Sequence, residues 1–288
     1  MPGPGTLPSV LNIAHRGARS LAPENTIAAA RKALEVGADM WELDVRMTAD
    51  GELIVVHDST LERTSNVTDV FPGRRPWSVH QFRLDEIRLL DFGSWFQERD
   101  PFGQIAAGVV SESDLAGYMG ELAPTLREIL TFTREHGRQI NLEIKDLSGS
   151  PGHSQVVSEV ISLVEELDMV DVVLVSSFNQ NYLSQVRAVN SKIATALLVS
   201  KPHPQALDLL RKLGAQAYHP RKTAIGADEV ALLNRQGFRV HVWNVNDQKT
   251  MRRLVENGVS GIFTDFPQVL ASFLSGLNGT MQGSGSAD

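Results

Sequence analysis

The sequence contains no cysteine, which excludes disulfides and thiolate chemistry but leaves the redox compartment open. It has no dense basic run, and its net charge is -7, so nothing indicates nucleic-acid binding. No apolar stretch is long enough to span a bilayer, and the first residues lack the basic and apolar regions of a secretory signal. A cytoplasmic protein without stable membrane association is therefore the simplest expectation.

A glycine-rich phosphate loop is also missing after the first expected strand, which argues against an open doubly wound sheet. Short β-rich apolar runs instead alternate with amphipathic helical segments, several of which end in glycine. This alternation predicts an α/β fold, a closed parallel barrel of the TIM type. The eight expected strands lie near residues 11–15, 40–47, 140–145, 171–177, 193–199, 215–219, 238–245 and 260–264.

Two parts of the chain depart from the alternation. Residues 58–123, after the second strand, are too long for an ordinary connection and are expected to form a small inserted subdomain. The polar, glycine-rich residues 276–288 are expected to be disordered, and residues 1–10 to be flexible. The remaining expectation is one catalytic barrel domain over residues 11–275.

The stretch "MWELDVRMTADGELIVVHD", residues 40–58, places charged residues inside what reads as a buried hairpin. Side chains alternate across a strand, so Glu42 and Asp44 point the same way. If Asp50 and Gly51 form a two-residue loop, Asp44 lies directly opposite His57. We therefore predict that the hairpin register itself gathers these two carboxylates and the imidazole.

Other polar residues end strands whose tips would meet at the same end of a barrel, where active sites of this fold lie. His15 and Arg16 follow the first strand, and Glu143 and Lys145 share one face of another. Together with the hairpin, these positions give three carboxylates, two histidines and two cations. An oxygen-rich site favours one divalent cation, Mg²⁺ or Ca²⁺, over zinc, and the positive charges suit a phosphate.

Ordinary structural roles compete with this interpretation. The carboxylates could be ion-paired, for example with Arg46, and Lys145 could be a solvated charge at a strand end. Aromatic residues in barrel strands are core as often as binding surface. On the later strands, His219, His241 and Asp265 could line the mouth.

The segments "AHRGARSLAPENT", "ELDVRMTADGELIVVHDSTLERT", "PTLREIL", "NLEIK", "VHVWNVN" and "GIFTDFP" resemble the glycerophosphodiester phosphodiesterase family. The resemblance covers about residues 11–275 and implies a TIM-type barrel with a small insertion after the second strand. It also implies hydrolysis of glycerophosphodiesters to glycerol 3-phosphate and an alcohol. Matched positions imply metal ligands at Glu42, Asp44 and Glu143, an acid/base pair at His15 and His57, phosphate binding by Arg16 and Lys145, and aromatic contacts from Trp243 and Phe178.

Two other functions fit parts of the pattern. A related barrel phospholipase would need an apolar or basic rim, for which "VFPGRRPW" in residues 70–77 is the candidate, and a non-catalytic phosphate-binding barrel would need some of these side chains to be absent. The sequence leaves open the head group, Mg²⁺ against Ca²⁺ and the oligomeric state. It also leaves open which histidine begins as base, and whether water or the substrate's own hydroxyl attacks phosphorus.

Overall fold

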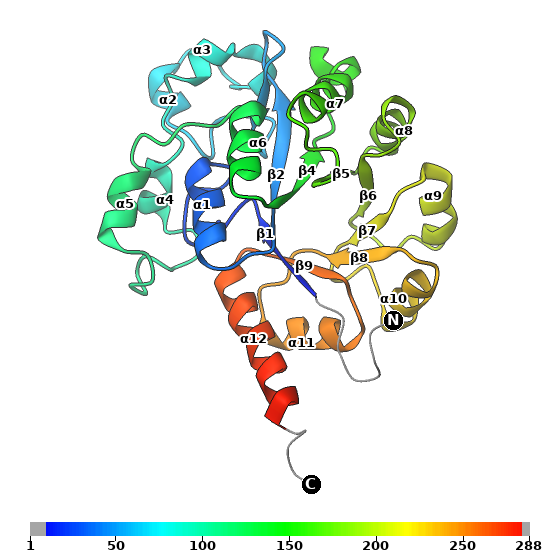
Figure 1. Cartoon of the computed structure of the whole chain (residues 1–288). Coiled ribbons are helices and arrows are strands. Elements are labelled where there is room, and N and C mark those ends of the chain that lie inside the picture. Colours follow the sequence, from blue (N-terminus) through cyan, green and yellow to red (C-terminus); the bar gives the residue numbers. More distant parts are fainter. Residues whose placement is uncertain (1–9, 284–288) are drawn as a thin grey trace.

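A closed parallel barrel forms the centre of the protein. The structure, a computed structural model, describes residues 10–283, with side chains through residue 277. Eight parallel strands follow the order β1-β9-β8-β7-β6-β5-β4-β2, and pairing of β1 with β2 closes the ring (Figure 1). These strands are β1 (Leu11–His15), β2 (Met40–Met47), β4 (Gln139–Ile144), β5 (Val173–Ser177), β6 (Ala194–Val199), β7 (Ala217–Pro220), β8 (Arg239–Val242) and β9 (Gly261–Thr264). The predicted eight-stranded barrel is confirmed.

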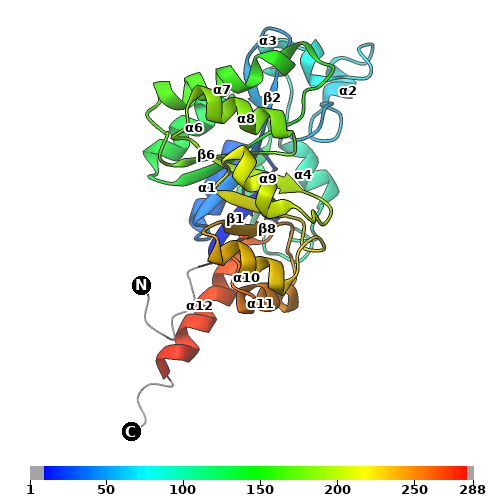
Figure 2. The same cartoon turned by 90° about the vertical axis from the view of Figure 1, so that its right-hand side faces the viewer.

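Helices surround this barrel and connect successive strands (Figures 1 and 2). Polar side chains start several of them, as where Thr125 and Glu128 form a reciprocal capping box at α6. The outer helices are α1 (Ile27–Glu35), α6 (Leu126–Glu135), α7 (Val156–Glu166), α8 (Gln180–Val189), α9 (Ala206–Leu213), α10 (Ala227–Arg235), α11 (Gln248–Glu256) and α12 (Pro267–Gly283), with a short 3₁₀ helix η2 (Pro151–Ser154) before α7.

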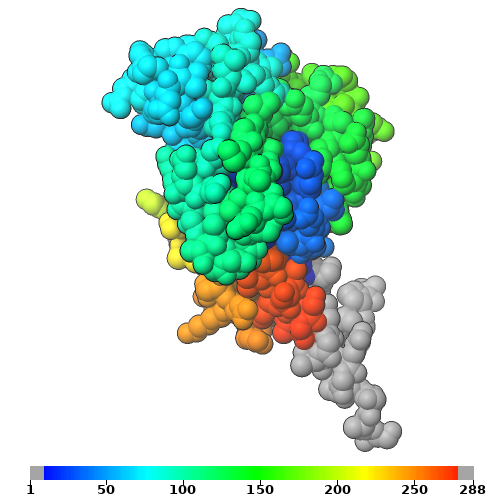
Figure 3. All heavy atoms as spheres, turned by 90° about the vertical axis from the view of Figure 1, so that its left-hand side faces the viewer, coloured from blue at the N-terminus to red at the C-terminus, as the bar shows by residue number. Residues whose placement is uncertain are grey.

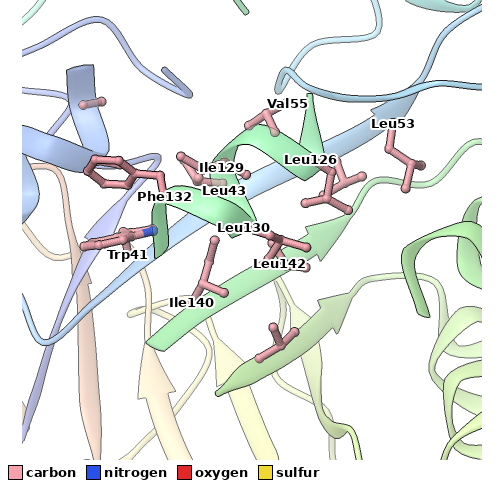
Figure 4. Packing of buried hydrophobic residues seen from close by; sticks show 14 of the residues in the cluster. Trp41, Leu43, Leu53, Val55, Leu126, Ile129, Leu130, Phe132, Ile140 and Leu142 are labelled. Carbon is pink, nitrogen blue, oxygen red and sulfur yellow. The ribbon is translucent and has the colours of Figure 1, made fainter. Parts of the chain in front are cut away.

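Alternation along β2 separates the core from the site. Trp41 and Leu43 point outward and share a buried cluster with Leu130 and Phe132 of α6 (Figure 4). The indole N–H of Trp41 donates to the hydroxyl of Thr133 at 3.1 Å, which satisfies its one polar atom. The intervening residues of β2 consequently face the barrel interior. That interior is filled below the site by apolar side chains, in the small clusters Ile13, Met40, Phe263 and Leu174, Ala196, Ala217.

The chain between β2 and α6 lies on the outside of the barrel and departs from the alternation of strand and helix. Strand β3 (Leu53–Val55) pairs antiparallel with β2 alone, and four short helices and a 3₁₀ turn follow. Part of this segment has its own buried cluster, and its surface occupies much of the face in Figure 3. We propose that residues 58–123 are an inserted subdomain. Its elements are α2 (Val67–Val70), η1 (Val79–Gln81), α3 (Leu84–Ile87), α4 (Ser94–Arg99) and α5 (Glu112–Tyr118).

The segment that we considered as a membrane-binding rim packs against the insertion itself. Trp77 is buried, and Phe71 is half-buried against the ring of Phe82. Arg74 lies over both phenylalanine rings and pairs with Glu86. Trp77, Phe71 and Arg74 are thus used inside the insertion, whereas Val70 and Arg75 are exposed. Among the helices described here, none has the length and apolar character needed to cross a bilayer.

The C-terminal prediction was partly wrong. Helix α12 extends through residue 283, away from the barrel (Figures 1 and 2), and so includes residues 276–283, where we expected disorder. An apolar stripe through Leu270, Phe273, Leu274 and Leu277 packs on the core and outweighs the nearby glycines. The predictions for residues 1–9 and 284–288 fall outside the described residues.

Candidate active site

The first site element is the turn that follows β1. His15 ends the strand, and Arg16 adopts a left-handed conformation with φ of 56°. This turn aims the backbone N–H of Arg16 at Glu42 Oε2, 2.9 Å away. Gly17 follows with φ of 77°, and a Cβ there would lie 2.6 Å from the Cβ of Ala29. Glycine is therefore required for the turn to pack against α1.

Three carboxylates meet above the apolar interior of the barrel. Parallel registers place His15 beside Glu42, and Asp44 beside Glu143 of β4. The carboxylate oxygens of Glu42, Asp44 and Glu143 lie within 4.8 Å of one another. Glu42 and Asp44 are 3% and 1% exposed. The sequence prediction that these three side chains converge is confirmed by this geometry.

Cations partly offset the negative charge of this trio. Lys145 Nζ lies 3.3 Å from Asp44 Oδ1 and 2.5 Å from Glu143 Oε1, and Arg16 Nε lies 3.4 Å from Asp44 Oδ2. Burial by itself would raise the pKa of Asp44, but Lys145 and Arg16 bring that pKa below its usual value. Burial, and then the charge of Asp44, raise the pKa values of Glu42 and Glu143. The raised pKa values therefore favour protonation of Glu42 or Glu143 unless a further cation binds beside them.

The trio has the chemistry of a site for a hard divalent cation. Glu42 Oε1 is buried without a hydrogen-bond partner, which is costly for a carboxylate oxygen, and Asp44 Oδ1 has only its ion pair with Lys145. Oxygen ligands from three carboxylates suit Mg²⁺ or Ca²⁺, with water completing the coordination. These residues could hold such an ion, and the donor set does not distinguish the two metals.

The predicted register of the hairpin was wrong by one residue. Asp44 lies opposite Val56, whose N–H donates to the Asp44 carbonyl at 3.0 Å, and not opposite His57. The loop has three residues because Gly51 adopts φ of 86°, the left-handed geometry of a bulged hairpin turn. His57 still lines the cavity of the site, because the chain leaves β3 after Val55 and no longer alternates.

Each histidine rests against a carboxylate that our sequence analysis undervalued. His15 Nδ1 lies 2.6 Å from Asp265 Oδ1, and His57 Nδ1 lies 2.6 Å from Asp58 Oδ1. From the sequence we predicted only that Asp265 could line the mouth, and we did not pair this residue with His15. Closure of the barrel makes β9 a neighbour of β1, and this was the signal that could have identified the pair. Burial, and then Arg16, lower the pKa of His15 to about 4, although Asp265 opposes that shift.

A buried glutamate organises the arginines around the turn, and the sequence analysis missed it. The carboxylate of Glu24 forms ion pairs with three guanidinium groups. The nitrogen-to-oxygen distances are 2.8 Å for Arg16, 2.7 Å for Arg19 and 2.6 Å for Arg63, which comes from the insertion. The next residue, Asn25, donates to Asp44 Oδ2 at 2.9 Å and accepts the Asp44 N–H at 3.2 Å. The "PENT" segment therefore fixes both a phosphate-binding candidate and a carboxylate of the trio.

The two histidines, the two phosphate-binding candidates, Glu42 and Glu143 line one cavity of about 540 Å³, which Asp44 does not line. Trp243 and Phe178 stand at its mouth with ring centres 5.8 Å apart in an edge-to-face arrangement. The indole N–H of Trp243 donates to the His219 carbonyl at 2.8 Å, and Phe178 is 44% exposed. The cavity is lined by His15, Arg16, Glu42, His57, Asn141, Glu143, Lys145, Ser176, Phe178, Leu198, Arg221, Lys222, Trp243, Asn244, Asn246 and Phe263.

Two histidines that could have lined the mouth lie deeper. His219 and His241 are 0% and 1% exposed, contact each other at 3.0 Å through Nε2 and Nδ1, and do not line the cavity. The expected ends of their strands were inexact, since β7 continues to Pro220 and β8 ends at Val242. The inward positions at the mouth belong instead to Arg221 and Trp243.

Comparisons with known proteins agree with this geometry. The profile of the glycerophosphoryl diester phosphodiesterase family matches residues 15–269. A glycerophosphodiester phosphodiesterase of Caldanaerobacter subterraneus is 32% identical over 264 residues, covering 92% of this chain and 97% of that protein. One from Bacillus subtilis is 31% identical and covers 90% of this chain and 85% of its own.

A solved structure gives the same result for the fold. A phosphodiesterase of Oleispira antarctica, in complex with the product sn-glycerol-3-phosphate, superposes with a TM-score of 0.78 at 27% identity, covering 93% of this chain and 97% of that one. With a family profile across most of its length and relatives above 30% identity, the chain belongs to the glycerophosphoryl diester phosphodiesterase family of hydrolases.

Proposed function

We propose that the protein hydrolyses glycerophosphodiesters to glycerol 3-phosphate and an alcohol, with a divalent cation and two histidines. The observation that carries the proposal is the convergence of Glu42, Asp44 and Glu143 within 4.8 Å. Glu42 and Glu143 line the same cavity as His15 and His57. The product bound to the Oleispira relative supports the glycerol phosphate half of the substrate.

The charged side chains have separable roles. Glu42, Asp44 and Glu143 would hold Mg²⁺ or Ca²⁺, which supplies charge stabilisation for a phosphate oxygen and lowers the pKa of a bound hydroxyl. Arg16 and Lys145 also line the cavity, and their positive side chains bind the remaining phosphate oxygens.

Proton transfer belongs to the two histidines. Each ring has Nδ1 against a carboxylate, Asp265 or Asp58, and we assign proton transfer with the substrate to Nε2. In His15 this Nε2 lies 3.4 Å from Asn244 Nδ2 and 3.9 Å from Glu42 Oε2. In the net reaction a water oxygen bonds to phosphorus, the bond from phosphorus to the head-group oxygen breaks, and the departing alkoxide receives a proton. One histidine accepts the proton of the attacking oxygen and the other protonates the leaving alcohol.

The test is release of glycerol 3-phosphate from glycerophosphocholine, glycerophosphoethanolamine and glycerophosphoglycerol, with Mg²⁺ or Ca²⁺ and with a chelator. We expect chelation to abolish turnover and His15→Gln and His57→Gln each to lower kcat by about 100-fold or more. His136→Gln is the matched control, because His136 is exposed at the end of α6, away from the cavity. Turnover that survives both substitutions would reject the assignment.

A further inference from the structure

Two basic residues occupy the mouth of the cavity opposite the assigned machinery. Along β7 the interior positions alternate, so Arg221 stands two residues beyond the buried His219 and above it. A parallel bridge pairs Arg221 with Trp243, and the Arg221 N–H donates to the Val199 carbonyl at 2.9 Å. The Lys222 N–H donates to the Trp243 carbonyl at 2.7 Å. The backbone of both basic residues is therefore fixed at the rim.

The charge of this rim is not neutralised locally. Lys222 Nζ has one weak partner, Asp247, at 4.0 Å, with both side chains partly in water. Within residues 10–277, no carboxylate lies within ion-pairing distance of the Arg221 guanidinium, which is exposed. The acidic side chains that line the cavity, Glu42 and Glu143, both belong to the trio assigned to the cation. A positive rim thus remains in a chain whose net charge is -7.

We propose that Arg221 and Lys222 select glycerophosphodiesters whose head-group alcohol carries an anionic group, a carboxylate or a phosphate. This inference rests on the proposed function. A guanidinium offers paired N–H donors that match either group. The cavity of about 540 Å³ has room for a head group beyond the phosphate that Arg16 and Lys145 would bind. Both basic residues line that same cavity, so an anionic head group meets positive charge as it enters.

The aromatic pair at the mouth raises the opposite alternative, a quaternary ammonium head group. A cation is attracted to the face of an aromatic ring, and quaternary ammonium groups are recognised by cages in which several faces converge. Here Phe178 and Trp243 meet edge to face at 88°, so the two rings contact each other. Arg221, the neighbour of Trp243 across the bridge, also adds repulsion for a cation. The rings therefore form an apolar wall, and the charged contacts come from the basic residues.

The experiment compares three small diesters of glycerol 3-phosphate that differ mainly in head-group charge. Their alcohols are ethanolamine, ethylene glycol and glycolate, which present an ammonium, a hydroxyl and a carboxylate. The leaving groups differ in intrinsic reactivity, so the readout is the ratio of kcat/KM values for the glycolate and ethanolamine diesters, compared between variants. Intrinsic reactivity cancels in that comparison.

We expect Arg221→Ala to lower this ratio by roughly five-fold, the size of one charge-assisted contact partly screened by water. Arg221→Glu should lower it further and favour the ethanolamine diester, and added salt should weaken the preference of the unmodified enzyme. Arg235→Ala and Arg235→Glu are the controls. They change net charge equally, on the exposed end of α10, which does not line the cavity.

The outcomes are distinct. A ratio that responds no more to Arg221→Ala than to Arg235→Ala overturns the inference, while hydrolysis of all three diesters leaves the proposed function standing. Loss of turnover confined to the ethanolamine diester in Arg221→Ala also overturns it. If the unmodified enzyme hydrolyses none of the three with Mg²⁺ or Ca²⁺, the proposed function itself fails, and this inference with it.

Discussion

Binding of a divalent cation should release a proton and stabilise the fold, because the carboxylate trio is crowded. At 4.8 Å and an effective dielectric constant of about 20, two ionised carboxylates repel by ~3.5 kcal/mol. Three such pairs would cost about 10 kcal/mol if every group were ionised. Lys145 and Arg16 offset part of this, and protonation of Glu42, whose pKa is raised by burial, offsets more. An incoming cation replaces that proton.

The expected results follow from linkage. A raised pKa for Glu42 means that its contribution to the stability of the cation-free protein is full below the ordinary glutamate pKa and is lost as pH rises through the raised value. Cation affinity should therefore increase with pH by up to about ten-fold per unit in that window. At a cation concentration about 100 times Kd the gain is ~2.7 kcal/mol. For a chain of this size that gain raises Tm by about 4–5 °C.

Two assays test this. Calorimetric titration of Mg²⁺ and Ca²⁺ in buffers of different ionisation enthalpy measures the number of protons released, and thermal unfolding measures the change in Tm. Glu143→Gln should weaken both effects, whereas Glu135→Gln, on the exposed end of α6, should leave them unchanged. If neither cation raised Tm and no proton were released between pH 5 and pH 8, the reasoning from the crowded trio would be refuted.

Three further predictions concern residues around the site. Glu24→Gln should lower the free energy of unfolding by ~3–5 kcal/mol, because it removes the carboxylate nearest to the guanidinium groups of Arg16 and Arg19. The pKa of Glu24 is lowered to about 2, so denaturation profiles should show that its stabilisation is present above the ordinary glutamate pKa and is lost as pH falls toward 2. Gly17→Ala should cost ~2–4 kcal/mol in chemical denaturation, because its Cβ meets Ala29 at 2.6 Å and its φ is positive. Asp265→Asn should lower kcat by at least about 10-fold. It should also move the acid limb of the pH–rate profile to lower pH, because Asp265 raises the pKa of His15. An unchanged kcat and an unchanged profile would contradict the role of Asp265 in positioning His15.

The sequence predicted those parts of the site that depend on alternation within one strand. Glu42 and Asp44 share a face because strand side chains alternate, and Glu143 joins them because parallel strands end at one edge of the barrel. The prediction of the hairpin register was wrong because the register depends on the backbone angle of Gly51. A glycine at this position is compatible with both a two-residue and a three-residue loop. No feature of the flanking strand residues distinguishes these loops.

Partners supplied by distant parts of the chain were harder to predict. Asp265 is 250 residues from His15, and their contact requires the ring to close between β1 and β9. Glu24 stands in a motif that the sequence analysis quoted, but no role was assigned to it, because its three arginine partners come together only when the insertion packs against the first βα unit. Both residues act through geometry that a single strand or helix does not contain.

Closure of the barrel therefore has a chemical consequence as well as a structural one. The Asn12 side chain of β1 donates to the Pro267 carbonyl at the start of α12, and Ser20 N–H donates to the Asp265 carbonyl. These contacts hold the end of the chain against its beginning at the point where Asp265 meets His15. The cation ligands, by contrast, come from β2 and β4, which pair along six residues of each strand. The carboxylate trio can thus form from one half of the barrel, whereas orientation of His15 needs the complete ring.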